Sequence, residues 1–475
     1  MGTAQESLSS VPLGEFADRR ASLASAVGDG WILTMGSAAP PQDYIPFHQN
    51  SPFRYLTGFT EPDAALLLRT EDGQVTWETL FVLPRDPATE TWEGYRVGPD
   101  HVEEMTGLPG RSIDEMAHVM DSILDADGVE RLHVVGAYNP GATVRNDVTQ
   151  RIDGLLGDRS GVEVVSANSH VNLLRGVKSE AEVELLRRSI EITTEGHRAA
   201  ARAIQIGRNE FEIQALVEYI FRRNGSERPA FASIVGSGPN STILHYNAND
   251  RFMEDGEMVL IDIGASYGGY AADVTRTYPV NGRFSDAQRE IYQLVLDAQL
   301  AAEELAAPGV TVGQLNQAAN RVLAEGLTEL GLIQAPDATF EDEQGRQVPQ
   351  LRLFYMHGLG HGIGLDVHDP WPSTLEAGTA FTIEPGVYVR PNLFDEVIPD
   401  TEANRELMAA IRPAFERYVN IGVRIEDDYV VTEDGVEWLS PAPRTIEAVE
   451  ALMSESIELD GERRDEWVEW YREMR

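Results

Sequence analysis

The sequence predicts an α+β protein in two parts: an α/β domain over residues 1–174, and a domain of helices packed on an antiparallel sheet over residues 175–475. Three observations predict this class. The chain has 475 residues, which is longer than one ordinary domain. A helix-opening pattern at Ser179–Glu182 marks a boundary near residues 175–178. Beyond that boundary, capped helices alternate with apolar runs, which is typical of helices layered on a sheet.

Hydrophobic periodicity predicts the elements of the first domain. Apolar spacing predicts helices over residues 16–26 and 112–124. Short apolar runs predict four strands, at residues 30–35, 64–69, 76–83 and 132–135.

Capping boxes predict four helices in the second domain, because each pattern places Glu or Gln three residues after Ser, Thr or Asn. The four patterns are Ser179…Glu182, Asn209…Glu212, Ser285…Gln288 and Thr311…Gln314. Glycine-rich residues 264–269 are expected to form the turn between two strands. The strand-like runs are residues 233–236, 258–263, 270–278, 381–389 and 423–431.

Three segments are expected at the periphery. Residues 336–349 are polar and acidic and predict a hairpin or an exposed loop. Residues 392–418 predict an insertion with a helix interrupted near Pro413, because proline disrupts a helix interior. The tail over residues 460–475 places aromatic side chains on one helical face, which we expect to dock on the body or on another subunit.

Composition excludes several classes of function. The chain has no cysteine, so thiolate catalysis and cysteine-based metal sites are excluded, and the composition fits a reducing cytoplasm. Its formal net charge of −40 would repel nucleic acid and anionic membranes, so neither is expected as a partner. The sequence contains no stretch of about twenty apolar residues, so no membrane-spanning helix is predicted. We therefore expect a cytoplasmic protein.

The stretch MHGLGHGIGLDVHD, residues 356–369, holds three of the ten histidines: His357, His361 and His368. Alternating glycines indicate a backbone that approaches another group closely. Imidazoles and acids beside such a backbone suggest a metal or proton-transfer site. The alternative interpretation is a loop with incidental histidines.

Four acids lie inside apolar strand-like runs, where an unpaired charge would be costly. They are Asp262, Asp273, Glu384 and Glu426. Each alone could form a salt bridge or lie at a sheet edge. Together with one histidine, they predict an oxygen-rich site that suits two divalent ions such as Mn²⁺ better than a structural zinc ion.

The second half resembles the pita-bread metallopeptidases, which include aminopeptidase P, prolidase and methionine aminopeptidase. The resemblance rests on LIDIG, ADVTRT, HGLGHGIGLDVHD, TIEPGVY and GVRIEDD, in this order, with Asp273 eleven positions after Asp262. In the first half, NSPFRYLTGFTEPDAALLL is similar to the N-terminal domain of bacterial aminopeptidase P. The resemblance covers roughly residues 12–450 and implies a pita-bread fold, also called creatinase/aminopeptidase-like, for the second domain.

The resemblance also implies roles for single residues. The positions of Asp262, Asp273, His361, Glu384 and Glu426 match the five ligands of a dinuclear metal site. Water held as hydroxide by two metal ions would attack the scissile carbonyl. Glu384 would transfer the proton, and His245, His357 and His368 would contact the substrate or the tetrahedral intermediate. Arg424 lies two residues before Glu426, on the same face of the strand, and from this position is expected to orient the ligands. Mn²⁺ is the expected metal, with Co²⁺ or Zn²⁺ as alternatives.

Two departures from the family pattern are visible. The loop after His368 is short and lacks an arginine that is often present there, which affects the outer substrate pocket. The 42 positions from Glu384 to Glu426 exceed the usual separation, as expected for an insertion at residues 392–418. Neither departure changes a ligand position.

The expected function is that of a Xaa-Pro aminopeptidase, which acts on peptides with proline at the second position. Prolidase, which cleaves Xaa-Pro dipeptides, is the alternative enzyme. A non-catalytic binding protein on the same fold is a more distant alternative, because such relatives have lost ligand positions that this chain keeps. A homo-oligomer, either dimer or tetramer, is also expected.

Overall fold

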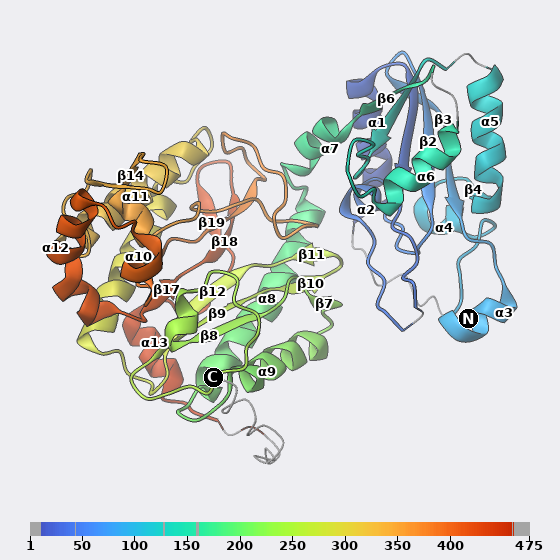
Figure 1. Ribbon diagram of the computed structural model, residues 1–475. Coiled ribbons are helices and arrows are strands. Elements are labelled where there is room, and N and C mark those ends of the chain that lie inside the picture. Colours follow the sequence, from blue (N-terminus) through green and yellow to red (C-terminus); the bar gives the residue numbers. More distant parts are fainter. Residues whose placement is uncertain (1–10, 43, 127–128, 158–160, 458, 460–475) are drawn as a thin grey trace. The chain divides into compact units, whose positions relative to one another are not determined.

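The computed structural model describes residues 11–42, 44–126, 129–157, 161–457 and 459 (Figure 1). Contacts within the chain divide it into two compact units, Met1–Arg175 and Gly176–Arg475. The helical tail expected at residues 460–475 lies outside the described residues. None of the described helices is long and apolar enough to cross a membrane.

Unit 1 is built on a mixed six-stranded sheet in the order β4-β3-β2-β1-β5-β6. Strands β1, β2 and β3 pair antiparallel, whereas β4, β5 and β6 join in parallel. The strands are β1 (Gly30–Met35), β2 (Ala65–Glu71), β3 (Gln74–Val82), β4 (Gly110–Ser112), β5 (Arg131–Val135) and β6 (Glu163–Ser166). The helices are α1 (Leu13–Val27), α2 (Ser51–Thr57), α3 (Pro87–Glu93), α4 (Val102–Thr106), η1 (Ile113–Glu115), α5 (Met116–Ala126), α6 (Asp147–Leu156) and α7 (Asn168–Arg175).

The core of unit 1 lies between the central strands and helix α5. Leu33, Leu67 and Phe81 are fully buried on three neighbouring strands, and Met116 and Met120 of α5 pack against them. This packing uses the alternation of side chains along each strand and the one-sided apolar face of the helix.

In the described part of the chain, unit 2 contains six α-helices, three short helical segments of 3-10 or π type (η2, η3 and η4) and several short antiparallel sheets. The helices are α8 (Glu180–Ala203), α9 (Glu210–Arg223), η2 (Gly238–Thr242), α10 (Asp286–Leu305), α11 (Val312–Glu329), η3 (Gln350–Leu353), η4 (Leu393–Val397), α12 (Glu402–Tyr418) and α13 (Ile446–Met453). The strands are β7 (Arg228–Pro229), β8 (Ile234–Ser237), β9 (Met258–Ile263), β10 (Ala265–Tyr267), β11 (Tyr270–Ala271), β12 (Val274–Pro279), β13 (Thr339–Glu341), β14 (Gln347–Pro349), β15 (Ala380–Ile383), β16 (Gly386–Tyr388), β17 (Gly422–Arg424), β18 (Asp427–Val431) and β19 (Val436–Trp438).

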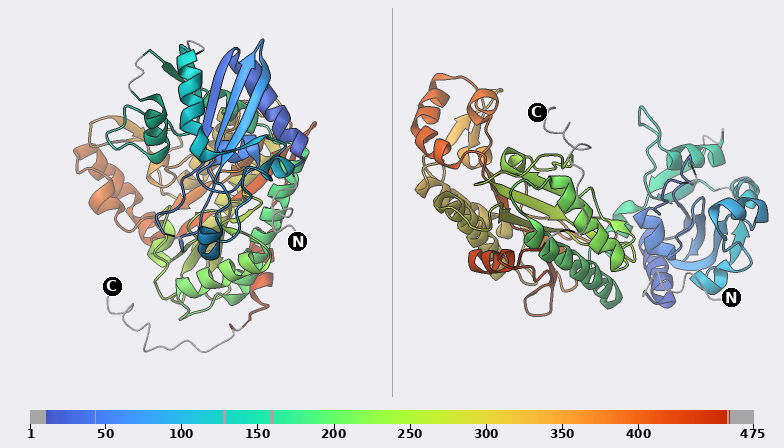
Figure 2. Two further views of the ribbon diagram at one scale, coloured as in Figure 1. Left: turned by 90° about the vertical axis from the view of Figure 1, so that its right-hand side faces the viewer. Right: turned by 90° about the horizontal axis from the view of Figure 1, so that it is seen from below.

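The helices of unit 2 cover two groups of strands. Helices α8 and α9 pack against the sheets β12-β9-β8 and β11-β10-β7. The second group is formed by the sheets β15-β18-β19 and β16-β17, and helix α10 packs against its strands β15, β16 and β17. Helix α11 packs on α10 (Figures 1 and 2). All four predicted capping boxes are present at the starts of α8, α9, α10 and α11. Local sequence therefore determined where these helices begin.

A reciprocal backbone pair joins the two groups of strands. The amide of Thr275 donates to the carbonyl of Glu426 at 3.3 Å, and the amide of Glu426 donates to the carbonyl of Thr275 at 3.1 Å. This bridge holds β12 beside the segment between β17 and β18. Acids carried by the two groups of strands are thereby brought close together.

Three predicted strands are each interrupted, and each interruption holds an acid. Residues 270–278 divide into β11 and β12 around Asp273, and residues 423–431 divide into β17 and β18 around Glu426. Residues 381–389 divide at Glu384 and Pro385, because Pro385 has no amide hydrogen to continue the ladder. Apolar character alone could not reveal these interruptions.

Two further expectations are corrected. Residues 264–269 are more than a turn, because β10 pairs with both β7 and β11 and only Gly268 and Gly269 reverse the chain. Helix α12 runs through Pro413 without interruption. Leu407, Ile411 and Phe415 bury one face at a spacing of four residues, and this packing outweighs the one hydrogen bond that proline removes.

Residues 336–349 contain the hairpin β13–β14, as predicted.

Candidate metal centre

Four acids and one histidine meet where the two groups of strands join. Asp262 lies on β9, opposite Thr275 of β12, and Asp273 immediately precedes β12. Glu384 follows β15, and Glu426 immediately precedes β18. Glu384 and Glu426 lie more than 100 positions after Asp273, but the pairing of strands places all four acids side by side.

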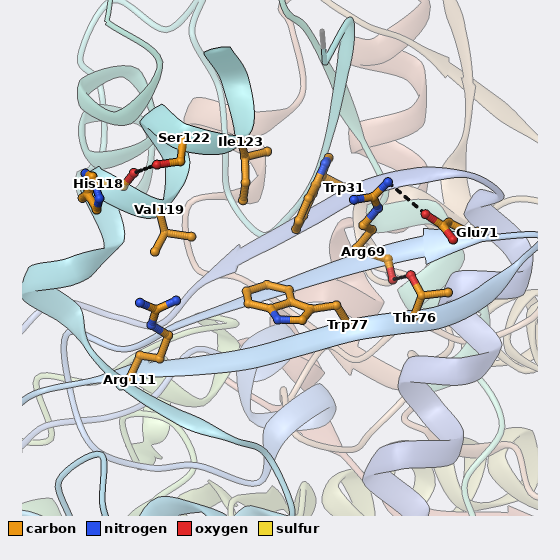
Figure 3. Close-up of a pocket in the computed structure, with 10 residues that line it drawn as sticks. All are labelled: Trp31, Arg69, Glu71, Thr76, Trp77, Arg111, His118, Val119, Ser122 and Ile123. Carbon is orange, nitrogen blue, oxygen red and sulfur yellow. Dashed lines mark hydrogen bonds and ion pairs between the residues drawn. The ribbon is translucent and has the colours of Figure 1, made fainter. Parts of the chain in front are cut away.

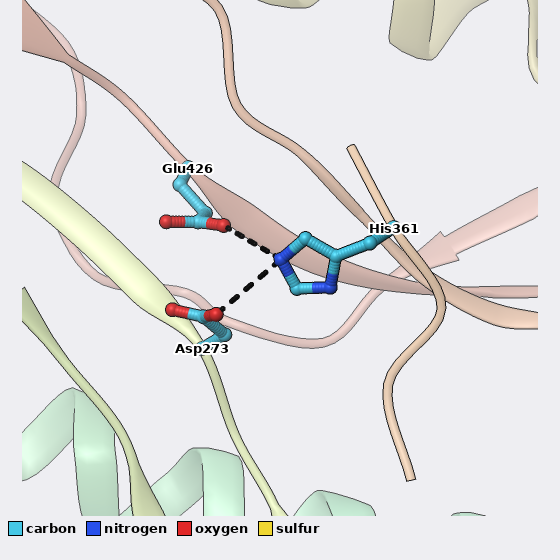
Figure 4. Close-up of side chains that lie close together, drawn as sticks. All are labelled: Asp273, His361 and Glu426. Atoms are coloured by element: carbon cyan, nitrogen blue, oxygen red, sulfur yellow. Dashed lines mark ion pairs between the residues drawn. The ribbon is translucent and has the colours of Figure 1, made fainter. Parts of the chain in front are cut away.

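His361 faces three of the acids. Its Nε2 lies 3.5 Å from Asp273 Oδ2 and 3.9 Å from Glu426 Oε1 (Figure 4). The same atom lies 3.6 Å from Glu384 Oε1. Ligand atoms of Asp273, His361 and Glu426 all lie within 4.8 Å of one another, a spacing that could hold a metal ion.

The orientation of the His361 ring leaves a lone pair directed at these acids. Its Nδ1 donates to the carbonyl of Gly362 at 3.1 Å, so Nε2 is the unprotonated nitrogen. Burial lowers the pKa of His361 to about 4, so the ring is neutral near pH 7. A lone pair therefore faces carboxylate oxygens, and a cation between them would satisfy both.

The acids are crowded as well as buried. Burial raises the pKa of Glu384 to about 8, and it raises the pKa of Asp273 and Glu426 well above the ordinary range. The negative charges of neighbouring acids raise the last two further. Ionised carboxylates at this spacing repel one another, so the cluster favours either bound protons or bound cations.

The residues fit a pair of divalent cations. Asp262 Oδ1 is buried and has no hydrogen-bond partner in the described part of the chain, as expected for an oxygen reserved for a metal. The donors are four carboxylates and one imidazole, which suits hard or borderline divalent ions. Two such ions would balance the four negative charges.

Arg424 links Asp262 to Glu426 through hydrogen bonds. Its guanidinium donates to Asp262 Oδ2 at 2.5 Å, to the Tyr388 hydroxyl at 3.0 Å and to Thr275 Oγ1 at 3.2 Å. The Thr275 hydroxyl in turn donates to Glu426 Oε2 at 2.6 Å. The network fixes one oxygen of Asp262 and one of Glu426, leaving the other oxygen of each for a ligand.

His357 is held next to Glu384 by two hydrogen bonds. Its Nδ1 donates to the carbonyl of Gly358 at 2.8 Å, and the Tyr388 hydroxyl donates to its Nε2 at 2.8 Å. Burial and the charge of Arg424 lower the pKa of His357 to about 3, so the ring is neutral. Its Nδ1 lies 3.7 Å from Glu384 Oε2.

A cavity of about 400 Å³ opens beside Asp262 and Asp273. His245 and His368 both line it. The ring of His368 packs edge-on against His361, with centroids 4.3 Å apart. The cavity is thus bordered by metal-ligand candidates and by two of the predicted substrate-side histidines.

A larger cavity of about 610 Å³ lies in unit 1 beside α5, and its lining carries different chemistry (Figure 3). Trp31, Arg69 and Trp77 lie in register on three neighbouring strands. Arg69 pairs with Glu71 at 2.9 Å, and Arg111 pairs with Glu115 at 2.6 Å, although Glu115 is outside the lining. No cluster of acids converges there, so we place the functional site in unit 2.

The structure also reveals residues that the sequence did not single out. Thr275 and Tyr388 connect Arg424 to Glu426 and His357. Asp428, fully buried, accepts a hydrogen bond from the amide of Asp273 at 3.1 Å. Thr275 lies two residues after Asp273 and Asp428 two residues after Glu426, so alternation along a strand was the available signal.

The paired groups of strands, with the acid cluster and His361 at their junction, are the arrangement expected of a metal-dependent enzyme of the pita-bread class. Comparison with known families specifies the class further. Residues 184–433 match the model of metallopeptidase family M24, and residues 16–132 match the aminopeptidase P N-terminal domain.

Individual relatives agree with both matches. A Xaa-Pro aminopeptidase of Haemophilus influenzae is 36% identical over 460 residues, which cover 94% of this chain and 99% of that protein. A human Xaa-Pro dipeptidase is 32% identical and covers 94% of each chain. The structure of Escherichia coli aminopeptidase P with the inhibitor Pro-Leu aligns with a TM-score of 0.79 at 32% identity, covering 94% of this chain and 99% of that one.

The chain therefore belongs to metallopeptidase family M24 and carries an aminopeptidase P-type N-terminal domain. The resemblance and the α+β fold class inferred from the sequence are confirmed. The protein is a metal-dependent peptidase, with a candidate metal-binding cluster at Asp273, His361 and Glu426.

Proposed function

We propose that this metallopeptidase is a Xaa-Pro aminopeptidase, which removes an N-terminal residue that precedes proline. One observation carries the proposal: the acid cluster with His361 borders a cavity, in a chain that is similar along almost its whole length to a Xaa-Pro aminopeptidase. The cavity of about 400 Å³ suits a small part of a peptide, such as one terminal residue.

Five residues would hold two metal ions. They are Asp262, Asp273, His361, Glu384 and Glu426. When bound, the ions supply Lewis-acid polarisation of the scissile carbonyl and acidify water at neutral pH. Mn²⁺ is the proposed metal, and Co²⁺ or Zn²⁺ would fit the same donors.

Glu384 is positioned to move a proton. Its Oε1 faces His361 at 3.6 Å and its Oε2 faces His357 Nδ1 at 3.7 Å. One oxygen can therefore serve the metal site while the other accepts a proton from water and delivers it to the leaving proline nitrogen.

The neighbouring groups orient the substrate. His357 is kept neutral, and its hydrogen bonds to Tyr388 and Gly358 fix the ring beside Glu384. His245 and His368 line the cavity from two different segments, where they can donate hydrogen bonds to the peptide carbonyl. Arg424 keeps Asp262 and Tyr388 in place.

Prolidase activity is the second candidate, because the human Xaa-Pro dipeptidase also covers 94% of the chain. The two activities differ in whether the pocket accepts residues beyond proline. Hydrolysis of a Xaa-Pro-Pro peptide supports the aminopeptidase, whereas hydrolysis of Gly-Pro alone supports the dipeptidase. We also propose a cytoplasmic homo-oligomer, a dimer or tetramer, which light scattering would test.

The decisive experiment compares metal-stripped and Mn²⁺-loaded protein on this peptide panel, with Glu384→Ala as the variant. Glu384→Ala removes a ligand and the proton carrier together, so we expect a loss of turnover of at least about 10³-fold with a native circular dichroism spectrum. Glu376→Ala is the matched control, because this exposed glutamate lies outside the cluster. Near-normal turnover of Glu384→Ala would contradict the mechanism.

A further inference from the structure

The chain contains a single lysine, Lys178, and its side chain is buried. Of the 38 basic residues only this one is lysine, and its side chain is 1% exposed. Its Nζ lies 2.8 Å from Oδ2 of Asp369, whose side chain is equally buried. Lys178 precedes α8, whereas Asp369 ends the stretch that contains the site histidines.

Asp369 stabilises the histidine loop, residues 361–369, which carries His361 and His368. Its Oδ1 accepts a hydrogen bond from the amide of Asp366 at 3.1 Å. Its own amide donates to the carbonyl of Gly362 at 2.8 Å, closing the loop across its base. The Asp369 carboxylate therefore links Lys178 to a loop whose two ends lie next to His361 and His368.

The backbone of Lys178 is anchored to the strands that carry the acids. Its amide donates to the carbonyl of Gly378 at 2.8 Å, and the amide of Gly378 donates to the carbonyl of Val431 on β18 at 2.9 Å. Lys178 thus connects β18, which begins directly after Glu426, with the histidine loop.

The space around the pair explains why lysine is present in a chain that otherwise uses arginine. A Cβ added at Gly364 would lie 2.5 Å from Asp369 Oδ2 and 3.0 Å from Lys178 Cε. The loop backbone therefore passes directly over the ion pair. The compact ammonium group of lysine fits in the space beneath the Gly364 backbone, whereas the planar guanidinium of arginine would require more room.

We propose that Lys178 is a positioning residue for the metal centre, and that it acts through Asp369 by holding the histidine loop in register with β18. His361 then faces Asp273 and Glu426, and His368 faces the cavity. The activity readout of this proposal rests on the proposed function, but its structural and metal-binding readouts do not.

The single lysine supplies its own probe. Acetylation with an N-hydroxysuccinimide ester modifies amines, and Lys178 carries the only side-chain amine in the sequence. Mass spectrometry of the peptide containing Lys178 then measures how often the ion pair opens. We expect native protein to react about 100-fold more slowly at Lys178 than protein unfolded in urea.

Metal binding should slow the reaction further. A metal on His361 ties down the same loop that Lys178 holds, so saturating Mn²⁺ should reduce acetylation at Lys178 about tenfold relative to metal-stripped protein. A lysine that only fills the core would react at one rate in both states. This comparison uses the unmodified sequence and does not depend on any variant folding.

Two glycine variants test the loop. Gly364→Ala places a methyl group against the ion pair and should raise acetylation at Lys178 at least about tenfold. Gly358→Ala is the matched control, because a Cβ there meets nothing within 4 Å, and it should leave acetylation unchanged. Equal rates in the two variants would count against the proposal.

Lys178→Met tests the effect on the site. We expect Mn²⁺ affinity, measured by titration calorimetry, to fall 10- to 100-fold, and kcat on a Xaa-Pro-Pro peptide to fall more than KM rises. Arg187→Met, which breaks the solvent-accessible ion pair between Arg187 of α8 and Glu437 of β19, should change neither. Unchanged Mn²⁺ affinity in Lys178→Met, together with Mn²⁺-independent acetylation of the native protein, would overturn the proposal. Because neither result needs catalysis, the proposal can fail or stand independently of the peptide specificity.

Discussion

Arg276 joins the two groups of strands that carry the acids, and Arg276→Met should destabilise unit 2 strongly. Its guanidinium donates to Asp427 Oδ1 at 2.6 Å, and both side chains are fully buried. It also donates to the carbonyls of Glu426 and Ala442 at 2.7 and 2.9 Å. Methionine keeps most of the volume but removes every one of these donors.

The magnitude follows from what remains around Asp427. Breaking a buried pair costs about 3–5 kcal/mol, because one charge is left without its partner. Asp427 keeps hydrogen bonds from Ser440 at 2.6 Å and Gln299 at 3.0 Å, and Arg444 lies 3.3 Å away. Because these groups still stabilise the Asp427 carboxylate, we expect the cost of leaving this charge unpaired to be about 3 kcal/mol, the lower end of that range. The carbonyls that lose a donor increase the loss of stability by roughly 1 kcal/mol. We expect a total loss of about 4 kcal/mol.

Urea denaturation of metal-stripped protein measures this loss. With a slope of about 3 kcal/mol per molar urea, the midpoint of unit 2 should fall by roughly 1.3 M. Arg187→Met is the control: its pair with Glu437, at 2.5 Å, is 36% and 42% exposed, so its removal should cost less than about 1 kcal/mol. Equal midpoint shifts for the two variants would refute the reasoning.

A second variant separates the buried charge from the loss of packing. If the uncompensated carboxylate causes the loss, Asp427→Asn in the Arg276→Met background should restore part of the midpoint, because a neutral amide needs no cationic partner. If the double variant is less stable than Arg276→Met, then lost packing and lost carbonyl hydrogen bonds dominate instead.

Three other features give measurable outcomes. Thr275→Val removes a hydroxyl that bridges Arg424 and Glu426, so Mn²⁺ affinity should fall about tenfold in calorimetry; unchanged affinity would exclude a role in ligand orientation. Burial lowers the pKa of His197 to about 3 from 6.5, so the unfolded chain binds more protons between these values, and stability falls below pH 6.5 by up to about 1.4 kcal/mol per unit. His197→Asn should flatten that part of the urea-midpoint curve, and parallel curves would contradict the assignment. The net charge of −40 implies self-repulsion that salt screens, so about 1 M KCl should raise the midpoint, and no gain would count against this.

Local sequence predicted the helices of unit 2 well because their starts are encoded over four residues. Ser179 and Glu182, for example, each satisfy a backbone amide of the other's turn, and no distant residue is needed. The uninterrupted course of helix α12 was not predicted, because it depends on contacts with residues outside the helix. Its passage through Pro413 depends on packing of Phe415 and its neighbours, including the ring of Phe394 at 4.4 Å, which no local pattern describes.

The acids were identifiable from the sequence because they interrupt apolar runs, but their arrangement was not. Each of Asp273, Glu384 and Glu426 lies where one strand ends and the next begins in a different sheet. The hydrophobic pattern predicts one continuous strand across each of these points, because the segments on both sides are buried. The network of Thr275, Tyr388 and Arg424 was not predictable for a similar reason. Arg424 of β17 donates to Thr275 of β12 in another sheet, and the Tyr388 hydroxyl donates to His357 in a loop.

The positions of the acids at these interruptions bear on how the site is held together. An acid within a continuous strand has its backbone fixed by one ladder, whereas Glu426 exchanges both of its backbone hydrogen bonds with Thr275 of the other group of strands. The repulsion among the carboxylates acts to separate the two groups, and Arg276 and Arg424 each donate across the same junction. Divalent ions between Asp273 and Glu426 would act in the same direction as these arginines. Metal affinity and the stability of unit 2 should therefore change together in variants at this junction, whereas variants at exposed pairs such as Arg187 and Glu437 should change neither.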